Sequence, residues 1–224
     1  RQELAAAVSA AHRLDVPVTV HCRGTPGIVN ALEAGVDQIE HACFERPGGS
    51  LSFDSELVRR MARAGISVTP TIQLYRDAQA HLKQKAADRG LNAAEAKRLA
   101  GLPGVIESKL EALRGFLAAG VTVVAGNDAG LPYTGFGCLW QELDAMTSGG
   151  MTAIQAITAA TRSAARTLGM EDRIGSIQPG KQADLIVVDG DPTTDIAALS
   201  RVRLVMLAGR TIFQKIDGCE PQHP

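Results

Sequence analysis

The sequence has no excess of charge of either sign. Lys and Arg number 23 against 24 Asp and Glu in 224 residues. A balance of this kind provides no basic field to hold nucleic acid or an anionic membrane surface. We therefore expect no nucleic-acid partner and no membrane partner, and a small molecule as the substrate.

Long apolar runs are also missing. None of the apolar stretches is long enough to cross a bilayer, and the N-terminus has no charged start followed by an apolar centre. We expect a cytoplasmic protein on this basis. The four cysteines have no CxxC spacing, so reduced thiols are the simplest state; they are Cys22, Cys43, Cys138 and Cys219.

Several catalytic motifs are absent from the sequence. There is no GxGxxG after a predicted strand, no phosphate-binding P-loop and no GxSxG elbow. These absences argue against nucleotide-dependent and serine-hydrolase functions.

The pattern that is present alternates helices with short buried strands. Apolar residues make up 45% of the chain and charged residues 21%, an ordinary globular balance. Helices are predicted around 1–14, 25–35, 54–65, 75–119, 141–146 and 152–169, with the long one interrupted near Gly90 and at 101–104. Strands are predicted at 16–20, 36–40, 66–71 and from 121, and this order is typical of a parallel sheet with crossover helices. From Gly175 the apolar period changes to two, which predicts a strand at 183–189 and a hairpin at 202–213 turning near Ala208 and Gly209.

Each of three predicted strands is followed by a residue of a type that commonly binds metals. His21 and His41 follow the first two strands, and Asp128 follows the fourth. Ligands of barrel enzymes lie at such strand ends. We expect these three residues to meet at a divalent metal ion, although histidines at strand ends are also common as purely structural residues. Imidazole and carboxylate ligands suit zinc, and other divalent ions can bind the same set.

Residues near these strand ends are candidates for substrate binding. Arg23 lies two residues beyond His21 and could meet a substrate carboxylate, or be a solvated loop arginine. Tyr75 follows the third strand and could reach the mouth of the site. Glu40 alternates with His41, so we expect it to point away from the site and to be structural.

Six stretches in order resemble the amidohydrolase superfamily, in particular its prolidase-like and imidazolonepropionase-like branch. They are VHCRG at 20–24, ALEAGVDQIEH at 31–41, VTPT at 68–71, AGNDAG at 125–130, AITAAT at 156–161 and SIQPGKQADLIVVDGDP at 176–192. Each stretch is weak by itself. Their order and spacing together make the signal specific.

The resemblance implies the C-terminal half of a (β/α)8 TIM barrel with part of a small flanking β-sandwich. Residues 1–170 would be barrel strands five to eight, and residues 171–224 the β-sandwich portion. His21, His41 and Asp128 would then be the metal ligands of strands five, six and eight. The HxH pair of strand one and the carboxylated lysine that the family often has on strand four have no counterpart here, and whether residues before Arg1 supply the remaining ligands stays open.

The implied function is hydrolysis of an amide-type C–N bond in a dipeptide or N-acyl compound, by water activated on one or two zinc ions. Asp128 would be the base that takes the proton from this water. A cyclic amide or aryl urea hydrolase and a deaminase stay open as alternatives, as does a non-catalytic fragment that lacks the first half of the barrel. Assembly as a homo-oligomer, or pairing with the missing N-terminal half, also stays open.

Overall fold

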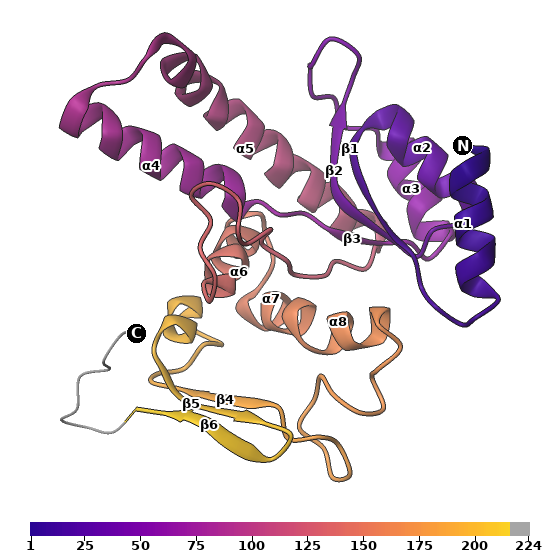
Figure 1. Cartoon of the computed structure of the whole chain (residues 1–224), viewed down its shortest axis with the longest axis vertical. Coiled ribbons are helices and arrows are strands. Elements are labelled where there is room, and N and C mark those ends of the chain that lie inside the picture. The colour runs from indigo at the N-terminus through magenta and orange to yellow at the C-terminus, as the bar shows by residue number, and fades with distance from the viewer. Residues whose placement is uncertain (216–224) are drawn as a thin grey trace.

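The computed structural model describes residues 1–215, and Cys219 lies outside the described residues. It shows an α/β fold with two separate three-stranded sheets. Within residues 1–215, no helix combines the length and the apolar character that crossing a membrane requires. The first half of the chain alternates helices and strands as predicted (Figure 1); the elements are α1 (Gln2–His12), β1 (Thr19–Gly24), α2 (Thr25–Ala34), β2 (Gln38–Glu45), α3 (Ser55–Arg63) and β3 (Ser67–Thr69).

The strands β1, β2 and β3 form a parallel sheet in that order, which confirms the predicted crossover pattern. Ile39 and Val68 lie on its apolar face, are completely buried, and belong to the main hydrophobic core. The helices α1, α2 and α3 lie on one side of the sheet (Figure 1). This packing leaves the opposite face for polar side chains.

Local sequence signals place most helix ends. The Asp54 side chain accepts a hydrogen bond from the amide of Leu57 and caps α3. Gly35 ends α2 with a φ of 74°, a conformation that glycine adopts without steric cost. The Thr25-Pro26 pair predicts Thr25 as the N-cap of α2, but the structure has Gly24 in that position, and the Thr25 hydroxyl makes no cap bond.

The predicted fourth strand is reduced to a single bridge. Val123 pairs in parallel with Val68, and the amide of Val124 donates to the carbonyl of Val68 at 2.9 Å. The predicted path beside β3 is therefore right, but the regular pairing is shorter than predicted. Gly126 permits this approach, because a Cβ atom there would lie 2.7 Å from the methyl group of Thr69.

The predicted helical segment 75–119 consists of α4 (Gln73–Arg89) and α5 (Ala93–Ala119), which form a projecting hairpin (Figure 1). The break at Gly90 is confirmed. The break predicted at 101–104 is wrong, because α5 continues through Pro103. Leu102 packs against Ala78 and Leu82 of α4, and this contact holds the helix together where proline removes a backbone donor.

The remaining elements are α6 (Leu139–Ser148), α7 (Ala153–Ala160), α8 (Arg162–Thr167), β4 (Leu185–Val188), the 3-10 helix η1 (Ile196–Ser200), β5 (Val202–Leu207) and β6 (Arg210–Gln214). The spacing of Thr152 and Gln155 predicts a capping box, and the structure has this box at the start of α7. The helix predicted at 152–169 is divided at Thr161, whose φ and ψ are −125° and −89°. The strands β4, β5 and β6 form an antiparallel sheet, and β5 turns into β6 at Ala208 and Gly209 as predicted.

Candidate metal-binding site

His21, His41 and Asp128 come together at one edge of the parallel sheet. The rings of His21 and His41 meet edge to face, with their centroids 4.5 Å apart. Nε2 of His41 lies 3.8 Å from Oδ2 of Asp128. The three predicted side chains, which are widely separated in sequence, therefore form one cluster.

The backbone at His41 departs from regular strand geometry. His41 and Ala42 have φ angles of 73° and 42°, which residues other than glycine rarely adopt. The alternation of side chains is therefore lost there. His41 turns toward His21 even though His21 stands opposite Glu40 in the parallel register.

This break overturns the expectation for Glu40. Its carboxylate accepts hydrogen bonds from Thr19 Oγ1 at 2.6 Å and from Gln38 Nε2 at 2.8 Å. Gln38 also donates to Thr69. Glu40 therefore lies on the polar face of the sheet that His21 shares by alternation with Thr19, and it does not point away from it.

The environment of His41 favours the neutral imidazole. The residue is only 7% exposed, and Nδ1 lies 2.7 Å from the hydroxyl of Thr71. Burial and then the nearby Lys109 ammonium lower the pKa of His41. A neutral ring with Nδ1 occupied by a hydrogen bond presents Nε2 as the free electron pair, which is the form that binds metals.

The donors fit a divalent ion in kind. Bonds of about 2.0–2.2 Å to nitrogen and oxygen can span the 3.8 Å between His41 and Asp128 with an ion between them. Across residues 1–215, however, no three His, Cys, Asp or Glu side chains are grouped closely enough to hold an ion as they stand. The cluster therefore provides ligands of the right type without a closed cage.

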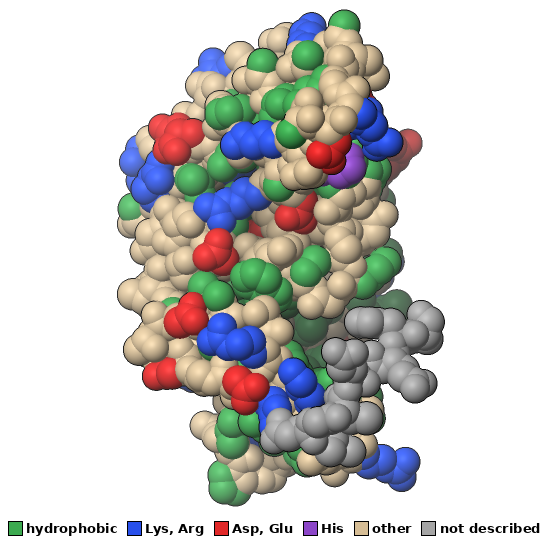
Figure 2. Space-filling model, turned by 90° about the vertical axis from the view of Figure 1, so that its left-hand side faces the viewer, with side chains coloured by type: hydrophobic (Ala, Val, Ile, Leu, Met, Phe, Trp, Pro, Cys, Tyr) green, Lys and Arg blue, Asp and Glu red, His purple; other side chains and the backbone are tan. Residues whose placement is uncertain are grey.

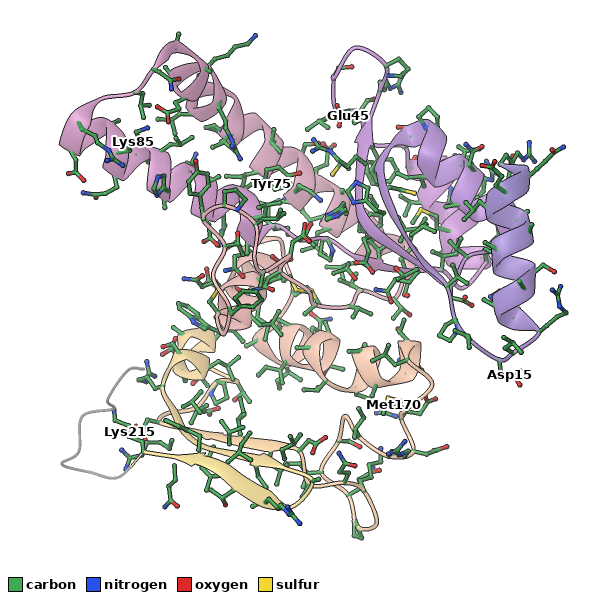
Figure 3. All side chains as sticks on the ribbon, in the orientation of Figure 1. Asp15, Glu45, Tyr75, Lys85, Met170 and Lys215 are labelled. Atoms are coloured by element: carbon green, nitrogen blue, oxygen red, sulfur yellow. The ribbon has the colours of Figure 1, made fainter. Side chains whose placement is uncertain are left out.

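Arg23 and Tyr75 line one small cavity of about 100 Å³, whose lining includes Lys109 but none of the three clustered residues. Arg23 pairs with Glu45 at 3.3 Å, and the Tyr75 hydroxyl lies 3.9 Å from the Cys43 thiol. In Figure 3, Tyr75 lies at the start of α4 and Glu45 at the end of β2. Burial raises the pKa of Tyr75, so its hydroxyl stays protonated and able to donate.

Cysteines border these residues without forming disulfides. Cys22, Cys43 and Cys138 are free thiols, as predicted. Cys22 pairs with His41 in the strand register, and Cys43 lines the small cavity. Burial raises the pKa of the Cys22 thiol, which keeps it protonated and unreactive.

The sequence reasoning missed Thr71, Lys109 and Glu142. Lys109 and Glu142 are buried, and Lys109 also lines the small cavity. A signal for both was present, because each stands at helical spacing among apolar residues: Lys109 between Ile106 and Leu113, Glu142 between Leu139 and Met146. Nothing in the sequence indicated that Thr71 would face His41.

Comparison with known proteins assigns the chain to a family. Ochratoxinase of Aspergillus niger is 28% identical over 205 residues, covering 91% of this chain and 39% of that protein. Its crystal structure matches with a TM-score of 0.73, covering 93% of this chain and 44% of the other.

Two further relatives differ in their chemistry. The crystal structure of a Xaa-Pro dipeptidase with bound methionine is 33% identical with a TM-score of 0.76, covering 95% of this chain and 48% of the other. A 5-methylthioadenosine/S-adenosylhomocysteine deaminase of Symbiobacterium thermophilum is 43% identical over 72 residues, 30% of this chain and 16% of that protein. The chain thus spans about half or less of the length of these relatives. The amidohydrolase family model matches residues 1–212, and the chain belongs to the amidohydrolase family.

Proposed function

We propose that this chain carries part of the active site of a metal-dependent hydrolase that cleaves an amide-type C–N bond in a small molecule, a dipeptide or an N-acyl compound. The observation that carries the proposal is the convergence of His21, His41 and Asp128 from three separate segments. Family membership supports it, since amidohydrolases generally use divalent metals. The likeness to a Xaa-Pro dipeptidase supports the choice of bond.

His21, His41 and Asp128 would hold zinc, as one ion or as two. A bound ion of this kind would supply a water that is ionised near neutral pH. Asp128 would take the proton of the attacking water and pass it to the leaving nitrogen. His41, held by Thr71, keeps its Nε2 directed toward Asp128.

Arg23 and Tyr75 would bind the substrate. The guanidinium of Arg23 and the hydroxyl of Tyr75 border the same cavity, and both can donate hydrogen bonds to a carboxylate. The Arg23 side chain is 55% exposed and pairs with Glu45. A carboxylate that entered would compete with Glu45 for Arg23.

The assignment of the chain to half of a barrel and part of a β-sandwich belongs to the same proposal. Residues 1–170 would be strands five to eight of a (β/α)8 barrel and residues 171–224 part of a β-sandwich. Because the relatives are about twice as long, further ligands would come from segments equivalent to their first halves. These segments, or a second copy of the chain, would be the protein partner.

The test is to measure the metal content and the activity of His21→Ala and Asp128→Ala in the full-length protein. Both variants should lose most of the bound zinc and at least about 10²-fold in the rate of dipeptide hydrolysis. Arg13→Ala, on an exposed stretch after α1, is the matched control and should keep both. Unchanged metal content and activity in both site variants would reject the assignment.

A deaminase is the second candidate, since the 72-residue match to a deaminase is 43% identical. A hydrolase of cyclic amides or aryl ureas would use the same water chemistry. Assays of dipeptides, lactams, aryl ureas and aminopurine nucleosides separate these activities. Release of ammonia without an amine or acid product would replace the peptidase proposal.

A non-catalytic fragment is the alternative from another class. The exposed apolar side chains of the C-terminal sheet, such as Ile186 at 53% and Ile212 at 61%, favour it. A chain that sediments as a monomer, binds no zinc and binds hydrophobic dyes would support this alternative over the enzyme.

A further inference from the structure

The turn after β3, residues 70–73, carries the residue that holds His41. Thr71 has a φ of 50°, which a β-branched residue rarely adopts. Its hydroxyl lies 2.7 Å from Nδ1 of His41. Strained backbone of this kind persists only where the surrounding structure imposes it.

The first group that imposes it is Lys109, from α5. Its ammonium donates to the carbonyl of Pro70 at 2.5 Å and to the carbonyl of His41 at 2.8 Å. The side chain is 3% exposed, and the ammonium lies 5.6 Å from the centre of the Tyr75 ring. A single buried cation thus joins the residue before Thr71 to His41 itself.

The second group is Glu142, from α6. It is completely buried, and its carboxyl oxygens accept from the amides of Ile72 at 3.0 Å and Gln73 at 2.6 Å. These amides belong to the first turn of α4, where backbone donors lack partners within the helix. Glu142 therefore holds the turn through the turn's amides, whereas Lys109 holds it through the carbonyl of Pro70.

We propose that Lys109 and Glu142 are positioning residues that clamp the 70–73 turn and, through Thr71, hold the His41 imidazole with Nδ1 on the hydroxyl and Nε2 toward Asp128. Burying such groups is expensive unless every polar atom is used. Apolar side chains of equal size could fill the space but could not hold two carbonyls and two amides. The inference rests on the proposed function of His41 and adds two residues to it.

The test follows the His41 ring by ¹⁵N NMR in metal-free protein, with its signals identified by their loss in His41→Gln. In the parent protein, Nδ1 should carry the proton. Thr71→Val should shift the ring toward a mixture of the two tautomers, whereas Thr71→Ser should restore the parent signal. Lys109→Met and Glu142→Gln should shift the same signal in the same direction.

Lys85→Met is the matched control. Lys85 of α4 pairs with Glu95 of α5 near the far end of the hairpin (Figure 3). Its loss should leave the His41 signal unchanged. An equal shift in this control would mean general loosening of the hairpin and would overturn the proposal.

A titration with Zn²⁺ alone is the second readout. Weakening of about 10- to 100-fold is expected in Thr71→Val, Lys109→Met and Glu142→Gln, as for other residues that orient metal-binding histidines. If Lys109→Met does not fold, Glu142→Gln and Thr71→Val decide the outcome. An effect of Thr71→Val without any effect of Glu142→Gln or Lys109→Met overturns the clamp. Full-length parent protein that binds no Zn²⁺ while the NMR pattern holds removes the proposed function and leaves the positioning role supported.

Discussion

The two sheets of this molecule differ in how much of them the described chain covers. In the parallel sheet, β3 is buried along its whole length, and β2 is buried at five of its eight residues. In the antiparallel sheet, every residue of β6 is exposed, and β4 has no buried residue. The cluster of His21, His41 and Asp128 lies at the parallel sheet, where His41 is buried and His21 is exposed.

The exposed antiparallel sheet also presents apolar surface that a partner could cover. The antiparallel sheet borders an apolar hollow of about 680 Å³ that includes Ile177, Ile186 and Ile212. On the face shown in Figure 2, Lys and Arg side chains are interspersed with Asp and Glu, so charge does not mark a docking patch there. Apolar side chains near β4 to β6 are exposed, and exposed apolar surface of this kind often marks an interaction site.

The largest effect should come from the core of the parallel sheet. Ile39→Ala removes a fully buried side chain between β1 and β3, so we expect a loss of about 2–5 kcal/mol in the free energy of unfolding. Urea denaturation followed by circular dichroism measures it. A loss below about 1 kcal/mol would mean that this sheet is as loosely packed as the other.

Glu142 should make the covered region sensitive to pH. Burial raises its pKa to about 7, from an ordinary value of 4.5. Because the folded state holds the proton more tightly, the stabilisation is complete below pH 4.5 and is lost as the pH rises through 7. The shift of about 2.5 units corresponds to roughly 3 kcal/mol.

Urea denaturation at several values between pH 4.5 and pH 7.5 measures this dependence, with Glu142→Gln as the reference. The two proteins share all other titrating groups, so their difference isolates Glu142. Stability curves that run parallel across the interval would contradict the assignment.

The smallest effect should come from the antiparallel sheet. Ile212→Ser changes a side chain that is 61% exposed, so we expect a change within about 0.5 kcal/mol in the free energy of unfolding. Binding of a hydrophobic dye should fall, because the residue borders the apolar hollow. A loss comparable to that of Ile39→Ala would remove the contrast between the sheets.

Local signals were enough to predict much of the fold. The capping box of Thr152 and the turn at Ala208 depend on a few adjacent residues, and each is found as predicted. The parallel order of β1, β2 and β3 followed from the alternation of helices and strands. The fourth strand and the path of α5 through Pro103 depend on contacts between distant segments, so these details were predicted wrongly.

The candidate site also has features that local sequence predicted and features that it did not. His21, His41 and Asp128 could be named from the sequence because each follows an apolar run, and the structure brings them together. Their role as metal ligands stays a prediction. The left-handed backbone of His41 could not be predicted from the local sequence, and the two residues that contact His41 there, Thr71 and Lys109, lie 30 or more residues away.

A proline in the middle of α5 separates two parts of the helix that pack in hydrophobic clusters of different size. Pro103 has no amide to donate, so the carbonyl four residues earlier lacks its usual partner in the helix. The part before it packs in the small cluster of Ala78, Leu82 and Leu102, and the part after it enters the main core with Leu113 and Phe116. We therefore expect the far end of the hairpin to open and exchange its amide hydrogens more readily than the length that carries Lys109.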